Sequence, residues 1–186
     1  VELLPLSSAE YESGPPGIKA VELARVVDRG IREAKAIDLK KLCIKAGEKA
    51  WFVTIDIITI NDAGNLFDAA GLAALAALRS ARFPAVDEKG VIDYKHKTDS
   101  KLPIVKEPLP VTVYKVSGQL MMDLSVAEEK AAEARLTVGC DAQGVISALQ
   151  KGGLASLSVD EVGRIIDMAV LKGKYLRSVL DTYVKK

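Results

Sequence analysis

Residues 53–78, VTIDIITINDAGNLFDAAGLAALAAL, join a β-branched run to a run of small apolar residues through a short polar turn. The β-branched run, which starts at Trp51, is typical of a strand, and the run from residue 66 to about residue 80 is typical of a helix. The turn between them, NDAGNLFD at 61–68, contains a glycine. Backbone N–H groups at a helix start attract anions, so this strand–glycine–helix turn is a candidate phosphate site.

The composition is that of a globular protein with little net charge. The chain has 186 residues, of which 49% are hydrophobic and 27% charged, and its formal net charge is +1. No uncharged apolar run approaches the roughly 18 residues of a membrane span, and we expect a cytoplasmic protein without membrane contact. The small net charge means that any RNA contact must come from a local patch. No nucleotide-binding glycine motif is present, and we expect no cofactor and no metal site.

Residues 18–35, IKAVELARVVDRGIREAK, have a helical period. At 100° per residue, three arginines lie within about 60° of one another, on the side opposite the apolar residues. The arginines are Arg25, Arg29 and Arg32, and the apolar residues are Ala20, Leu23, Val27, Ile31 and Ala34. The pattern predicts an amphipathic helix with a stripe of arginines.

The arginine stripe belongs to a local surplus of positive charge. Between residues 19 and 45 there are eight basic and four acidic residues, which predicts a basic patch. An arginine can grip a phosphodiester with two hydrogen bonds and stack on bases. The alternative is a solvated face, because Glu22 with Arg25, and Asp28 with Arg32, are spaced for intrahelical ion pairs.

Hairpins follow the first helix. Residues 42–46 and 50–61 predict an antiparallel pair joined by a turn at 47–49. The polar, proline-rich stretch at 82–110, with a short strand at VIDY, predicts an excursion on the surface. Two more hairpins are predicted in the second half, formed by residues 111–116 with 119–125 and by residues 135–140 with 145–150.

The last segment opens with Ser158-Val159-Asp160-Glu161, which is a capping box. It predicts one long amphipathic helix that runs toward Tyr183. The order helix, hairpin, helix, hairpins, helix indicates an α+β fold, with β-sheets flanked by helices.

Three stretches together resemble a known family: ELARVVDRGIREAKAIDLKKLCI (22–44), residues 53–78 quoted above, and LMMDLSVAEE (120–129). With the closing capped helix, they resemble the RNase PH family, and within it the non-catalytic RNase PH-like branch of the archaeal exosome. The resemblance implies an RNase PH-like fold of two pseudo-repeated β/α units. Residues 1–186 would form a single domain, with 1–80 the remainder of a first unit that lacks its first strands and 81–186 the second unit.

In phosphorolytic members of that family, the turn before this helix reads Asp, Gly or Ala, Gly, Thr, Arg, and the arginine holds phosphate. Here Asp62, Ala63 and Gly64 match, whereas Asn65 and Leu66 replace the threonine and the arginine. An isobutyl group cannot neutralise phosphate. We therefore expect a degenerate phosphate site that keeps the shape of the turn without its chemistry; a simple turn with a helix start is the alternative.

Active relatives also carry two acids six residues apart. Asp123 and Glu129 have this spacing, but Glu for Asp moves the second carboxylate outward by one methylene, and acid or metal chemistry depends on its placement. We expect a degenerate acid site and no catalytic residue. From the sequence alone, an acid at a strand end followed by two glutamates is typical of a helix N-terminus.

The resemblance implies a function for the arginine stripe. Arg25 and Arg29, and less directly Arg32, would bind RNA beside the active site of a catalytic RNase PH-like subunit. The two kinds of subunit would alternate in a hetero-hexameric ring, a trimer of heterodimers, with RNA-binding cap subunits. The expected function is that of a non-catalytic subunit of a phosphorolytic 3′ to 5′ exoribonuclease in RNA degradation and processing. The alternatives are a chain that is itself a phosphate-dependent exoribonuclease, or a pure protein-interaction module.

Overall fold

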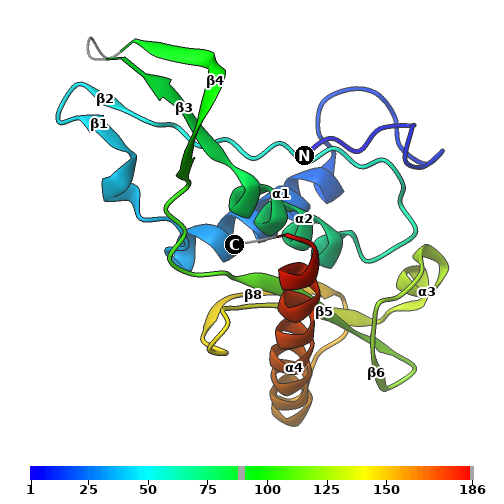
Figure 1. The fold of residues 1–186 in the computed structure, drawn as a ribbon. Coiled ribbons are helices and arrows are strands. Elements are labelled where there is room, and N and C mark those ends of the chain that lie inside the picture. The colour runs from blue at the N-terminus through cyan, green and yellow to red at the C-terminus, as the bar shows by residue number, and fades with distance from the viewer. Residues whose placement is uncertain (88–90, 185–186) are drawn as a thin grey trace.

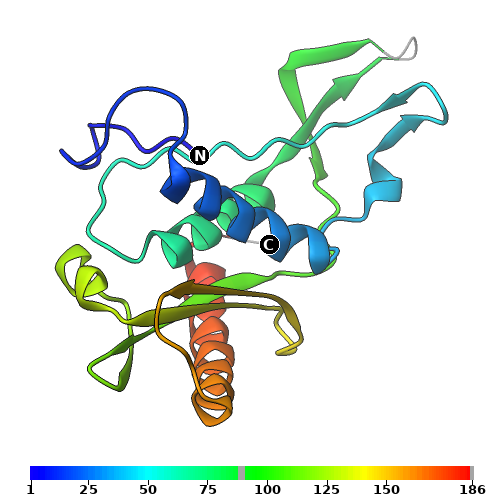
Figure 2. The same cartoon turned by 180° about the vertical axis from the view of Figure 1, so that it is seen from behind.

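Two helices pack against each other in the first half of the chain. They are α1 (Ile18–Glu33) and α2 (Leu66–Ser80) of the computed structural model, which describes residues 1–87 and 91–184. Figure 2 shows α1 lying across α2. The buried side chains between them are Leu23, Val26, Val27, Leu66, Phe67, Ala70 and Ala74. Both helices predicted from the sequence are confirmed.

A four-stranded antiparallel sheet forms the second half, in the order β6–β5–β7–β8. Its central strands, β5 (Leu109–Val116) and β7 (Ala134–Cys140), are buried at nearly every position. The outer strands are β6 (Gln119–Met122) and β8 (Ile146–Gly153). The two hairpins predicted in this half are confirmed. Nearly continuous burial of a strand means that both faces of the sheet are covered.

α4 (Val159–Tyr183) covers one face of the sheet, and α2 lies against the other (Figure 1). The predicted capping box is present, because the Ser158 side chain accepts from the backbone of Glu161. On the α2 side the approach is close: a Cβ added at Gly71 would be 2.2 Å from the Pro110 ring. The buried core under α4 consists of Val111, Val113, Leu136, Val138, Ile165 and Ala169.

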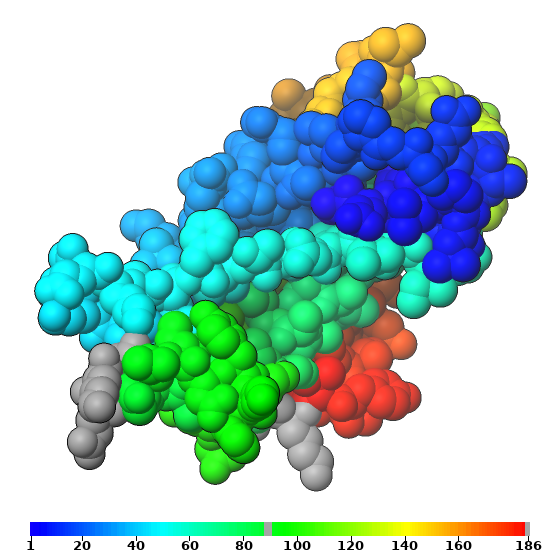
Figure 3. Space-filling model, turned by 90° about the horizontal axis from the view of Figure 1, so that it is seen from above, coloured from blue at the N-terminus to red at the C-terminus, as the bar shows by residue number. Residues whose placement is uncertain are grey.

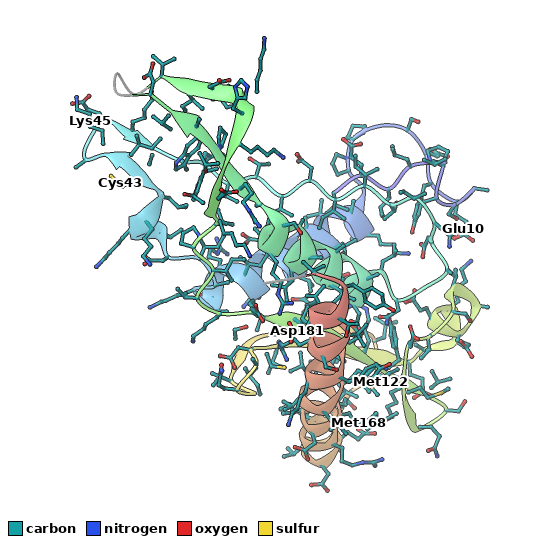
Figure 4. The ribbon with its side chains drawn as sticks, in the orientation of Figure 1. Glu10, Cys43, Lys45, Met122, Met168 and Asp181 are labelled. Atoms are coloured by element: carbon teal, nitrogen blue, oxygen red, sulfur yellow. The ribbon has the colours of Figure 1, made fainter. Side chains whose placement is uncertain are left out.

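A buried arginine joins the two helices that flank the sheet. Arg79, at the end of α2, has a side chain that is 3% exposed. It donates from Nε to Glu107 at 2.9 Å and from Nη1 to Asp181 of α4 at 2.7 Å. Asp181 is labelled in Figure 4, on the half of α4 that is nearer to α2. Arg79 therefore links the C-terminal end of α2 to the C-terminal end of α4.

The predicted first hairpin is present but short. It consists of β1 (Cys43–Lys45) and β2 (Lys49–Ala50). Residues 51–61 continue as an extended segment across the face seen in Figure 3. Within the described ranges they form one isolated β-bridge, between Glu2 and Ile58. Their side chains still alternate, with Ile55 and Ile57 packed on the α1–α2 core. The sequence pattern fixes this alternation, but a ladder also needs a neighbouring strand.

The predicted surface excursion contains a hairpin that is longer than expected. β3 (Arg82–Val86) pairs with β4 (Ile92–Lys101), and together they project from the body of the molecule in Figure 1. Two short helices complete the fold, a 3-10 helix at Leu39–Leu42 and α3 at Val126–Ala131. None of the helices in the described part of the chain is long and apolar enough to cross a membrane.

Candidate nucleic-acid interface and anion turn

Glu22 on α1 turns toward the sheet and does not pair with Arg25. Its carboxylate accepts a hydrogen bond from Arg135 Nη2 on β7 at 2.6 Å and one from Gln150 Nε2 on β8 at 3.3 Å. The Arg135 guanidinium also lies over the ring of Phe67 on α2, with 4.3 Å from Cζ to the ring centroid. These contacts join both helices to the sheet, and they remove a negative charge from the outer face of α1.

Arg25 and Arg29 lie one turn apart on α1 in different environments. Arg25 is exposed, and no hydrogen bond or ion pair links it to another of the described residues. Arg29 is half-buried and lines a small hollow between α1 and β8 with Leu149 and Gln150. Arg25 is therefore available to an outside anion, and Arg29 borders the edge strand of the sheet.

Arg32 is exposed but engaged. It forms ion pairs with Asp28 at 3.1 Å and with Glu33 at 3.6 Å. The prediction of an intrahelical pair is confirmed for Asp28 with Arg32 and is wrong for Glu22 with Arg25. Spacing along a helix allows a pair, but a carboxylate on the inner side is attracted more strongly to a partly buried guanidinium.

Asp62 organises the turn before α2. Its carboxylate accepts from the Tyr11 hydroxyl, from Lys19 Nζ at 3.1 Å and from the backbone N–H of Gly64 at 3.0 Å. Burial acts to raise the pKa of Asp62, but the hydrogen bonds from Tyr11 and Lys19 outweigh it and lower the pKa below its ordinary value. The positive charge of Lys19 is therefore neutralised inside the turn.

The turn itself is tightly packed. Gly64 has φ +108°, and a Cβ there would be 2.1 Å from the carbonyl oxygen of Leu124. Ala63 is exposed, whereas Leu66 is 7% exposed and belongs to the α1–α2 core. Leu66, which the resemblance aligns with the arginine of active members, thus points into the core.

The structure brings the two predicted acids to this turn. Asn65, the N-cap of α2, has φ +52° and donates its backbone N–H to Glu129 Oε1 at 2.8 Å. Its side-chain Nδ2 donates to Asp123 Oδ1 and to Asp68 Oδ2, each at 3.2 Å. Glu129 also accepts from the Tyr114 hydroxyl at 2.6 Å. The predicted turn and the predicted acid pair form one cluster.

Two carboxyl or hydroxyl groups of the cluster have raised pKa values. Burial raises the pKa of Asp68 to about 6. Burial, together with the hydrogen bond to Glu129, also raises the pKa of Tyr114. Among the described residues Asn65 Oδ1 and Asp68 Oδ1 are buried without a well-formed hydrogen bond, although the backbone N–H and the hydroxyl of Thr112 partly oppose the rise in the pKa of Asp68. The described part of the chain contains no group of three or more His, Cys, Asp or Glu placed to hold a metal ion.

Sequence reasoning missed four residues that shape these sites, namely Tyr11, Lys19, Tyr114 and Arg135. Their partners are distant in sequence, so no local spacing indicated them. One weak signal was available: an arginine at the start of the apolar strand RLTVGC is unusual in a buried strand and needs a partner.

Comparison with known proteins identifies the family. The model of the 3′ exoribonuclease family, domain 1, matches residues 1–84, and that of domain 2 matches residues 106–171. Over 181 residues the chain is 45% identical to the exosome complex component Rrp42 of Methanocella arvoryzae, which covers 97% of this chain and 67% of that protein. The chain belongs to the 3′ exoribonuclease (RNase PH) family.

Other relatives agree with this assignment. The Rrp42 component of Thermococcus onnurineus is 43% identical over 180 residues, or 95% of this chain and 66% of that protein. A solved structure described as an Archaeoglobus fulgidus exosome with RNA bound to the active site matches with a TM-score of 0.85 and 40% identity, covering 95% of this chain and 67% of the other. The predicted RNase PH-like fold is confirmed. The chain spans about two thirds of the length of these family members.

Proposed function

We propose that this protein is a non-catalytic, RNA-binding subunit of an archaeal exosome ring. The observation that carries the proposal is the turn before α2. In this turn Asp62 accepts from the Gly64 N–H, and Leu66 is buried where a phosphate-binding arginine would be needed. The similarity to Rrp42 components supports membership of the ring.

The acids of the cluster support the absence of catalysis in this chain. The Glu129 oxygen is taken by the Asn65 N–H and the Tyr114 hydroxyl, and Asp123 is bonded to the Asn65 amide. A general acid must be within hydrogen-bond reach of the substrate, and one oxygen of each carboxylate, Glu129 Oε1 and Asp123 Oδ1, already accepts from donors of this chain. The catalytic partner therefore performs phosphorolysis, and residues 1–186 act as one domain that supports it.

α1 supplies the RNA contact in this proposal. Arg25 has no hydrogen bond or ion pair with any residue of 1–87 or 91–184 and is the principal contact, Arg29 is the second, and Arg32 contributes less because Asp28 and Glu33 compete for it. Phosphate contacts release counterions, so RNA affinity falls as salt rises. Each lost contact reduces the slope of that dependence by about one unit.

RNA binding by the assembled ring tests the arginines. The Arg25→Ala, Arg29→Ala variant is compared with an Arg164→Ala, Lys174→Ala variant, which removes two exposed cations from α4. We expect the α1 variant to reduce the slope of log affinity against log salt by up to about two units, and the α4 variant to leave it unchanged. Equal slopes in all three rings would show that α1 does not contact RNA and would favour a pure interaction module.

Catalysis is tested separately, with RNA, phosphate and magnesium. The protein alone, the catalytic partner alone and the two together are compared. We expect nucleoside diphosphates only where the partner is present. Phosphate-dependent shortening of RNA by the pure protein alone would overturn the non-catalytic assignment.

A further inference from the structure

Glu129 places a negative charge at the start of α2 from within the chain. Backbone N–H groups at a helix N-terminus carry partial positive charge and favour an anion. The Asn65 N–H and the Tyr114 hydroxyl both donate to the same oxygen, Glu129 Oε1, at 2.8 and 2.6 Å. Tyr114 is 2% exposed, so one of the two donors is fixed in the core.

The same contact attaches α3 to the rest of the molecule. α3 has no fully buried residue, and Val126 is its one half-buried apolar side chain, so apolar packing holds it only weakly. Its second long-range polar contact, Lys130 with Glu10 at 2.6 Å, joins two side chains that are more than half exposed, and such pairs contribute little. Figure 4 labels Glu10 on the N-terminal loop that faces α3. The Glu129 contact is the better-shielded attachment of the two.

We propose that the Glu129 carboxylate is a built-in anion that closes the start of α2 to inorganic phosphate and fastens α3 to α2. The inference rests on the proposed non-catalytic role, and it gives a second reason why this chain would not bind phosphate. Leu66 in place of the arginine removes an attraction for phosphate, and Glu129 occupies one of the donors at the helix start, the Asn65 N–H. Asp123 and Asp68, both bonded to Asn65, add repulsion against a second anion.

The NMR resonance of the Asn65 backbone amide tests directly whether phosphate binds at the start of α2. In the parent protein, this resonance is expected to show no saturable shift when phosphate replaces chloride at constant ionic strength. In a Glu129→Ala, Asp123→Asn variant, the N–H is free and two charges are gone, and a saturable shift is expected. The matched control is Glu133→Ala, Asp167→Asn, which removes two exposed carboxylates elsewhere and should behave like the parent.

Thermal unfolding gives the second measurement. At a phosphate concentration about ten times its Kd, Tm of the Glu129→Ala, Asp123→Asn variant should rise by about 3–6 °C relative to chloride. The parent and the control should not respond. A saturable phosphate shift of Asn65 in the parent overturns the proposal, and so does a folded variant that responds no more than the control.

Single variants keep the proposal testable if the double variant does not fold. Glu129→Gln retains an oxygen that can accept from both donors, so hydrogen exchange at the Asn65 amide should stay near that of the parent. Glu129→Ala should speed this exchange by about tenfold or more relative to Glu133→Ala. Unchanged exchange in Glu129→Ala would overturn the contact. None of these results depends on RNA binding or on phosphorolysis, so they fail separately from the proposed function.

Discussion

Arg135 Nη2 on β7 donates a hydrogen bond to the Glu22 carboxylate on α1 at 2.6 Å. The Glu22 and Arg135 side chains are 26% and 16% exposed, respectively, so the pair is largely shielded from water. This contact helps to hold α1 over the sheet, and it leaves Arg25 without a partner on its own helix. The direction of Glu22 decides whether α1 presents a neutral Glu22–Arg25 pair or an Arg25 without a partner on its helix, so this contact also bears on the RNA binding proposed for α1.

Replacing Glu22 by Ala should destabilise the protein by about 2–3 kcal/mol, because Arg135 would keep a buried charge without its carboxylate. Urea unfolding measures the change. Asp28→Ala is the control, since it breaks the exposed pair with Arg32 and should cost less than about 0.5 kcal/mol. Equal losses in the two variants would contradict a special role for Glu22.

Asp68 should make stability depend on pH. Its pKa rises from 3.8 to about 6 on folding because it is buried. Between these values the folded state binds more protons than the unfolded state, so stability falls as pH rises through this window and stays lower above it. A shift of about two pKa units corresponds to about 3 kcal/mol. Asp68→Asn should recover up to about that amount at pH ~7.5 and almost none at pH ~4.

Urea unfolding of the parent and of Asp68→Asn at the two pH values checks this. Asp167→Asn, on the exposed face of α4, is the control and should change neither value. A gain from Asp68→Asn of the same size at both pH values would show that the effect is not due to ionisation.

Gly64 should not tolerate a side chain. Its φ is +108°, and a Cβ would be 2.1 Å from the Leu124 carbonyl oxygen. Gly64→Ala is expected to lower the free energy of unfolding by about 2–4 kcal/mol. Gly47→Ala separates strain from crowding, because Gly47 also has a positive φ but no atom within 4 Å of the added Cβ. It should cost about 1 kcal/mol; similar losses would mean that the contact with Leu124 is unimportant.

Arg79→Met should destabilise the protein by about 3 kcal/mol, because Glu107 and Asp181 lose a guanidinium that is 3% exposed. The measurement is thermal or urea unfolding. Lys45→Met provides the comparison, since Lys45 pairs with Glu48 at an exposed site and such pairs contribute less than about 1 kcal/mol. A loss no larger than in Lys45→Met would show that the buried network adds no net stability.

Much of the fold could be predicted because its signals are local. The apolar period of residues 18–35 and the Ser158–Glu161 capping box depend on residues within one helix, and both were confirmed. The extended segment at 51–61 shows the limit of such signals. Its alternation correctly indicated which side chains face the core, but strand pairing depends on a neighbour that periodicity does not specify.

The candidate site also has features that the sequence predicts and contacts that only the folded structure decides. Sequence by itself determined the composition of the turn and the position of Arg25 on a helix face, because both follow from residue type and helical geometry. The resemblance to the family implied that Leu66 stands where active members carry an arginine. Only the tertiary structure decided the partners. Asn65 and Glu129 are 64 residues apart, and Glu22 and Arg135 are 113 apart. Such contacts form because burial brings distant polar groups together and makes an unpaired one costly, and burial is a property of the folded chain.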